Sequence, residues 1–200
     1  MTKHKRLISI AGSDIDRLSP MQLKESILKS EGRVICGQHL LFASAGLVRG
    51  VTNSELMFSF GADMVMLNTF NFDDDSKNLG LQGLSYRELR TLCRRPIGVY
   101  MGCPGADADV EDGLYDRGGM LATPKHVERA VEMGVDFIVL GGNPGSGTRI
   151  ADVLATTARV KGRYGDDVFA GGSSPENIHQ LSISIKGMPY TYYRMASVNR

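Results

Sequence analysis

The sequence lacks the features that mark several common protein classes. It has three cysteines in 200 residues, an odd number with no C-x-x-C pair, which disfavours both a disulfide framework and a structural zinc site. Its 23 Lys and Arg residues are balanced by 22 Asp and Glu residues, whereas a dedicated nucleic-acid binder needs a basic surplus. We therefore expect reduced thiols, a cytoplasmic location and no nucleic-acid partner.

Long apolar runs are also missing. The apolar stretch at residues 7–12 ends before Asp14 and is shorter than a typical signal-peptide core of about 7–15 residues. No window approaches the roughly 18 apolar residues of a membrane helix. The apolar runs at 64–67 and 137–140 have the length of buried strands. We therefore expect neither a signal peptide nor a membrane segment.

What the sequence does contain is an alternation of strand and helix signals. Helix starts are marked by Ser19-Pro20, Thr52-Asn53, Ser85 and Thr123-Pro124, because Ser and Thr cap helices and Pro suits the first turn. A further helix is predicted over about 149–163, and a last one from Pro175 through about Ile185. Short strands are predicted at 33–36, 63–67, 97–101, 136–140 and 167–170.

These strands are continuous apolar runs, which is typical of a parallel sheet covered by helices on its outer side. The sequence therefore predicts a single α/β domain over residues 1–200, a TIM-barrel-like series of strand–helix repeats. About five to six strands are recognisable. A closed barrel of eight strand–helix units typically needs about 250 residues, so the barrel is expected to be shortened.

Two segments of the chain resemble each other. Residues 60–68 and 133–143 both contain a helix-ending glycine, then Asp, then a buried strand. Such echoes are common in barrels. Convergence explains the likeness equally well, because any turn from helix to strand favours glycine.

Ligands of parallel α/β folds bind where the strands end. This rule selects Gln38, His39 and Asn68 as the candidate catalytic residues. His39 is a candidate general base, although a hydrogen-bonded structural histidine is the commoner case. Cys36 and Cys103 lie near strand ends too, but a role as small buried residues is favoured.

Two glycine-rich loops are candidate anion sites, because glycine lets the backbone approach a ligand and helix starts present free N–H groups. The first loop has no Gly-Lys-Ser/Thr ending, so it is not a P-loop. Flexible loops or a capping box at Ser174 would also explain these sequences. The candidate substrate- or anion-binding residues are Gly142, Asn143, Gly145, Gly147 and Thr148 in the first loop and Gly171, Gly172 and Ser173 in the second.

Acidic runs suggest a metal only weakly. Asp73, Asp74 and Asp75 are adjacent, and hard cations such as Mg²⁺ take carboxylate ligands. Adjacent carboxylates point in different directions, so a solvated loop is favoured. The acidic loop at 105–113 lacks the spacing of an EF-hand. We assign no metal ligands, and Mg²⁺ is the one cofactor kept as an alternative.

Several segments together resemble an uncharacterised bacterial family whose members carry the labels phosphoenolpyruvate phosphonomutase-like or haloacid dehalogenase-like hydrolase. The resemblance runs in order through SEGRVI, GADMVMLNTFN, RPIGVYM, GVDFIVLGGNPGSGT and PENIHQLSISIKG…TYYRMA. It implies a TIM-barrel-like fold. Neither label comes with its motif, since the DxDx(T/V) nucleophile and the lysine–cysteine–glycine loop are both missing. Strands six to eight of the family pattern have no counterpart, which indicates a missing internal segment near 170–173.

Two functions remain open. The first is an enzyme of the lyase, isomerase or hydrolase type that binds a small phosphorylated or carboxylated metabolite. The second is a non-catalytic, shortened barrel with an assembly or regulatory role. In that case the open sheet edges, or Tyr190, Tyr192 and Tyr193, would pair into a homo-oligomer.

Overall fold

A computed structural model describes residues 5–10, 12–43, 46–103, 105, 118–142, 148–172, 180–183 and 191–197 of the chain. Strands and helices alternate along most of it. The strands are β1 (Cys36–Leu40), β2 (Met64–Asn68), β3 (Ile97–Gly102), β4 (Phe137–Gly141), β5 (Ala170–Gly172), β6 (Gln180–Ile183) and β7 (Thr191–Ser197). The α-helices are α1 (Gly12–Ile15), α2 (Pro20–Lys29), α3 (Asn53–Ser59), α4 (Tyr86–Cys93), α5 (Pro124–Met133) and α6 (Ile150–Tyr164).

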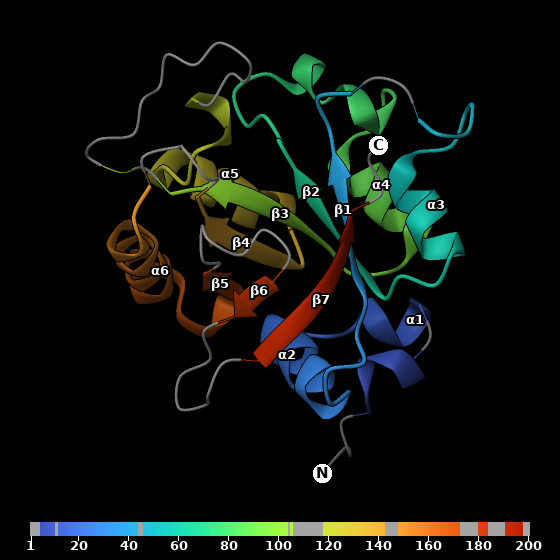
Figure 1. Ribbon diagram of the computed structural model, residues 1–200, viewed down its shortest axis with the longest axis horizontal. Coiled ribbons are helices and arrows are strands. Elements are labelled where there is room, and N and C mark those ends of the chain that lie inside the picture. The colour runs from blue at the N-terminus through green and yellow to red at the C-terminus, as the bar shows by residue number, and fades with distance from the viewer. Residues whose placement is uncertain are drawn as a thin grey trace.

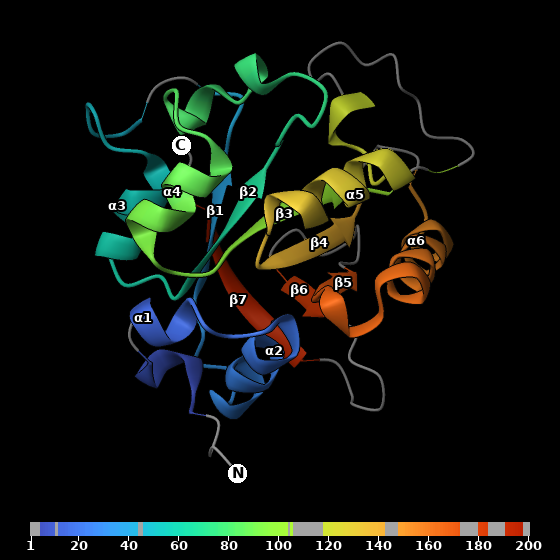
Figure 2. The same cartoon turned by 180° about the vertical axis from the view of Figure 1, so that it is seen from behind.

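All seven strands belong to one sheet with the order β5-β4-β3-β2-β1-β7-β6. β1 to β5 pair in parallel, and β7 pairs in parallel with the other edge of β1. β6 pairs antiparallel with β7. The sheet curls, so that β6 at one end of the strand order comes close to β5 at the other (Figures 1 and 2).

The fold is therefore α/β with a parallel sheet and helices, as the sequence predicts. The number and direction of the strands are not those of a complete TIM barrel within the described residues, since one of the seven strands is antiparallel. Where the sequence predicts the last helix, the structure has β6 at Gln180–Ile183, so that prediction is wrong there. The backbone of 180–183 instead hydrogen bonds to β7.

The first four predicted helix starts are confirmed, whereas the one at Pro175 lies outside the described residues. The side chains of Ser19, Thr52 and Ser85 each accept a hydrogen bond from the backbone three residues on, and each is part of a reciprocal capping box. Thr123 caps α5 in the same way without the reciprocal bond. Two strands lie further along the chain than predicted, β1 at Cys36–Leu40 and β5 at Ala170–Gly172.

The strands bury both faces. On the outer face, side chains such as Leu67, Val99 and Leu140 pack in a core that includes residues of α3, α4, α5 and α6. On the inner face, Met66, Phe137 and Val139 pack in a second core that includes residues of the N-terminal segment and α2. Both views place α1 and α2 at the end of the sheet where β1 begins (Figures 1 and 2). The opposite end, where the strands finish, is the expected ligand-binding end.

Within the part of the chain that the structure describes, no helix combines the length and the apolar character needed to cross a bilayer.

Candidate functional site

The candidate site is the inner face of the sheet where β1, β2 and β3 end. Side chains alternate between the faces of a strand, and the inner core contains Cys36, Met64 and Met66. Gln38 of β1 and Asn68 of β2 are two residues further on, so they face the same side. Both are half-buried, whereas the residues below them are buried. The two predicted amides therefore lie on one polar surface.

Tyr100 of β3 joins this surface. It packs against the inner core and is half-buried. The pairing of Leu67 with Val99 places Asn68 beside Tyr100 on the neighbouring strand. Sequence reasoning missed Tyr100 because it lies within an apolar strand rather than after it. The alternation of Gly98, Tyr100 and Gly102 along β3 was the available signal.

The end of β2 has an unusual backbone. Thr69 has a φ of 62°, which is rare for a β-branched residue. Its Oγ1 accepts hydrogen bonds from the amides of Leu41, at 3.0 Å, and Phe42, at 3.2 Å. The amide of Thr69 donates to Oδ1 of Asn68 at 2.7 Å. These bonds hold the ends of β1 and β2 together, and strained backbone of this kind concentrates at functional sites.

His39 lies on the other face of β1. Its side chain is 1% exposed, and its Nδ1 is 2.8 Å from Oγ of Ser54 in α3. A Cβ added at Gly80 would lie 2.8 Å from His39 Nε2. The Gly80 backbone therefore packs directly against the second ring nitrogen. The structure thus separates His39 from Gln38 and Asn68. It is a structural histidine between the sheet and the helices.

Burial gives His39 a testable pH signature. Desolvation lowers the pKa of His39 to about 4, so the folded state disfavours its proton while the unfolded state takes it up near pH 6.5. The free energy of unfolding should therefore fall as the pH drops from 6.5 towards 4, by up to about 3 kcal/mol from this group. Above pH 6.5 His39 is unprotonated in both the folded and the unfolded state, so it no longer makes the free energy of unfolding depend on pH.

Urea unfolding at a series of pH values, compared with His39→Asn, measures this effect. Asn keeps a polar atom near Ser54 but does not titrate, so its stability should fall less steeply below pH 6.5. Equal slopes for the two proteins would contradict the assignment.

The environment of the three cysteines favours the protonated thiol over the thiolate. Burial raises the pKa values of Cys36, Cys93 and Cys103 to about 12, and all three thiols are free. Cys36 and Cys103 are buried, as expected for small residues of the core, whereas Cys93 is half-buried.

The first glycine-rich loop is described only at its ends. Gly142 is buried, and a Cβ there would come within 2.4 Å of Thr148 Cβ, so glycine is required for the two loop ends to meet. Thr148 Oγ1 donates to the carbonyl of Cys103 at 3.0 Å. Asn143, Gly145 and Gly147 lie outside the described residues.

The second loop begins on β5. Gly171 pairs with Val139 and Gly172 with Leu140, so both belong to the sheet, and Ser173 lies outside the described residues. β4 ends at Gly141 and β5 at Gly172, and β4 lies next to β3, which carries Tyr100. Anion binding by the two loops stays a prediction.

The three consecutive aspartates point to different partners. Asp73 accepts from Lys125 Nζ at 2.8 Å and lies 3.1 Å from His126 Nε2. Asp75 binds Arg129, and Asp74 accepts from Ser76. Among the described residues no group of three His, Cys, Asp or Glu side chains could hold a metal ion. The second acidic loop falls within undescribed residues.

The chain was compared with protein families, curated proteins and solved structures. A family model described as "Domain of unknown function (DUF7916)" matches residues 8–173 and 163–200. No curated protein matches significantly, and no solved structure does. The family match carries no activity, so it gives no support to the phosphonomutase-like or dehalogenase-like labels. Because the two matched segments together span nearly the whole chain, the protein belongs to the DUF7916 family.

Proposed function

We propose that this protein binds a small metabolite carrying a phosphate or carboxylate group at the inner face of the sheet, where the strands end. The observation that carries the proposal is the half-buried polar surface of Gln38, Asn68 and Tyr100 on three adjacent strands. Amides and a phenol donate hydrogen bonds to anionic oxygens without a charge of their own. The candidate anion loops begin at the ends of β4 and β5, on the same edge.

The reaction proposed for such a ligand is of the lyase, isomerase or hydrolase type, on a TIM-barrel-like scaffold shortened near 170–173. The division of the family match at residues 163–173 supports the shortening. Among the described residues no group of three His, Cys, Asp or Glu side chains could hold Mg²⁺. Its ligands would therefore have to come from the metabolite or from residues outside the described ranges. Catalysis needs a proton-transferring group near the polar surface, and His39 faces away from it.

A second candidate function therefore has its own support. The described inner face offers amides, a phenol and glycine backbone but no carboxylate, lysine or histidine. Such a surface suits ligand binding without turnover, as in a regulatory or assembly protein. Homo-oligomers would be the expected partner, and light scattering that shows a monomer would count against an assembly role.

Variants of equal size that introduce a negative charge test the binding proposal. Asn68→Asp keeps the Oδ1 that accepts from the Thr69 amide but adds a negative charge. Gln38→Glu adds a negative charge on β1. Each should weaken binding of an anion by about tenfold or more, because a desolvated like charge repels it. Gln22→Glu is the control, because it adds the same charge at the start of α2, away from the polar surface, and keeps the Oε1 that accepts from the Ser19 amide.

The measurement is a nuclear magnetic resonance titration with inorganic phosphate and with phosphoglycolate, which carries both anionic groups. Amide shifts should change at Gly141, Gly142 and Thr148. No change at these amides, or equal affinity in Asn68→Asp and Gln22→Glu, would refute the proposal. Assay of the same metabolites for turnover then separates the enzyme from the non-catalytic binder.

A further inference from the structure

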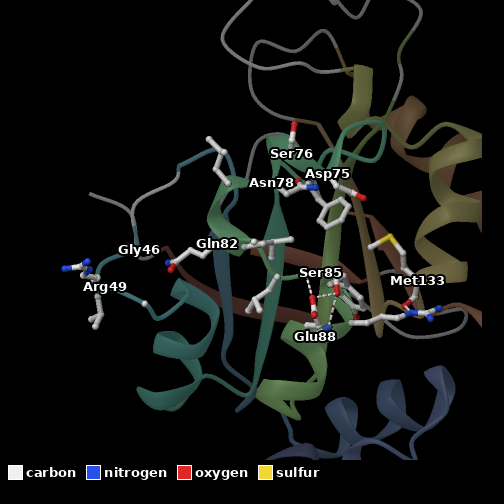
Figure 3. Close-up of a pocket in the computed structure, with 18 of the residues that line it drawn as sticks. Gly46, Arg49, Asp75, Ser76, Asn78, Gln82, Ser85, Glu88 and Met133 are labelled. Carbon is white, nitrogen blue, oxygen red and sulfur yellow. Dashed lines mark hydrogen bonds between the residues drawn. The ribbon is translucent and has the colours of Figure 1, made fainter.

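A cavity of about 970 Å³ lies on the opposite, outer side of the sheet. Its walls come from the β1–α3 loop, the connection between β2 and α4, and the adjoining parts of α4 and α5 (Figure 3). The volume is at the upper end of the range of about 300–1,000 Å³ found for small-molecule sites. The polar surface of Gln38 and Asn68 does not contribute to it.

The floor of this cavity is apolar. Phe70, Leu81 and Tyr86 are buried and belong to the outer core, and Leu84 and Met133 pack against them. On the walls, Val48 and Leu79 remain 45% and 48% exposed. These side chains would gain from contact with an apolar molecule.

The polar groups around the cavity are already hydrogen-bonded within the wall. Asn78 bonds in both directions with the backbone of Asn71, at 2.7 and 3.0 Å. Gln82 donates to the carbonyl of Val51, and Ser85 pairs with Glu88, as Figure 3 shows. A ligand therefore meets apolar surface rather than unused polar groups over most of its length.

Arg87 is the exception. It is exposed, and its guanidinium donates to the carbonyls of Glu132, at 2.8 Å, and Met133, at 3.5 Å. Because these partners are uncharged, its positive charge is not neutralised among the described residues. The other nearby arginine, Arg129, is bound to Asp75, and Arg49 points away from the other labelled side chains in Figure 3.

We propose that this cavity binds a small carboxylic acid with an extended apolar body, its carboxylate at Arg87 and its apolar part along Leu79, Leu81 and Met133. A cation whose hydrogen-bond partners are uncharged, beside a large apolar floor, matches one anionic group on an apolar chain or ring. This site is separate from the proposed metabolite site, since the two lie on opposite faces of the sheet.

The test uses the fluorescent anion 8-anilinonaphthalene-1-sulfonate as probe, with decanoate and decanol as competitors. The full chain should bind the probe at one saturable site. Decanoate should displace it at a concentration about tenfold below that of decanol, because only decanoate has the charge. Equal potency of the two competitors would overturn the proposed role of Arg87.

Matched variants locate the site. Leu79→Asp should weaken decanoate binding about tenfold or more, through lost apolar contact and charge repulsion. Leu92→Asp changes a leucine that is 57% exposed outside the cavity and should leave binding unchanged. Arg87→Gln should weaken decanoate but not decanol. An equal loss in the two leucine variants would refute the site.

Two further outcomes are decisive. Asn68→Asp should leave probe binding unchanged, which keeps this proposal distinguishable from the metabolite site. A dimer detected by light scattering that is lost in Leu79→Asp would show that a second copy of the chain occupies the cavity, and would overturn the small-molecule proposal.

Discussion

Replacement of Arg90 by alanine is expected to lower the free energy of unfolding by about 3–5 kcal/mol. Arg90 lies on α4 with only 15% of its side chain exposed. Its Nε is 2.6 Å from Oδ2 of Asp136, and its Nη2 is 3.2 Å from Oδ1. Its Nη1 bonds Asp16 of the segment that follows α1 at 3.0 Å.

The size of this effect comes from Asp136. Burial raises the pKa of this carboxyl, while the hydrogen bonds from Arg90 and the Ile97 amide oppose the rise. Without Arg90, a carboxylate with 19% side-chain exposure would remain without its counter-ion in a poorly solvated position. That cost, and not the strength of the pair itself, dominates the loss.

Arg94 provides a matched control one turn further along the chain. It also bonds Asp16, at 3.0 and 3.2 Å, but its side chain is 56% exposed. Arg94→Ala should therefore cost at most about 1 kcal/mol. Urea unfolding of both variants is the measurement. Similar losses of unfolding free energy in Arg90→Ala and Arg94→Ala would show that the Asp136 carboxylate does not need Arg90 as its counter-ion.

Replacement of Gly98 by alanine is the second substitution with a large expected effect. Gly98 pairs with Phe137 on the adjacent strand. A Cβ at Gly98 would lie 2.4 Å from the Phe137 ring and 2.5 Å from the Phe137 carbonyl oxygen. Because one of these atoms is backbone, side-chain rotation cannot relieve both contacts. We expect a loss of about 3 kcal/mol, at the upper end for overpacking.

Gly162→Ala is the control with the opposite sign. Gly162 lies inside α6, and a Cβ there meets nothing within 4 Å. Alanine should stabilise the helix by about 0.5–1 kcal/mol, since it restricts the unfolded chain more than glycine does. Urea midpoints again report both effects.

A Gly98→Ala protein as stable as the wild type would mean that β3 and β4 can separate at low cost. Adding Phe137→Ala should not restore full stability, because the carbonyl clash stays.

The internal echo in the sequence has a structural counterpart. Asp63 and Asp136 both precede a strand, and each accepts a hydrogen bond from an amide near the start of the neighbouring strand, at 2.9 Å from Ile35 and 2.8 Å from Ile97. The amide of each aspartate also donates back to the same residue. The glycine before each aspartate has a positive φ. This arrangement ties β1 to β2 and β3 to β4 in the same way.

Local signals in the sequence were sufficient for much of the secondary structure. Capping residues such as Ser19 and Ser85 satisfy the free amides of their own helices, and this interaction spans only three residues. Buried strands such as β2 and β4 stand out because each contains four successive apolar residues. The α/β class follows from these elements because parallel strands require covering helices. The helix predicted over 175–185 failed where antiparallel pairing with the next strand, β7, decides the conformation of 180–183.

The candidate site depended on information that the sequence does not carry. When a strand is buried on both faces, its apolar pattern does not show which residues face inward. Neighbouring residues Gln38 and His39 looked equivalent, yet one faces the polar surface and the other is sealed against Ser54. The sequence by itself determined the strand–helix order, the helix starts and the residues at strand ends. The tertiary structure alone decided the inner face, the addition of Tyr100, the Arg90–Asp136 pair and the outer cavity, because each depends on how segments far apart in the chain pack together.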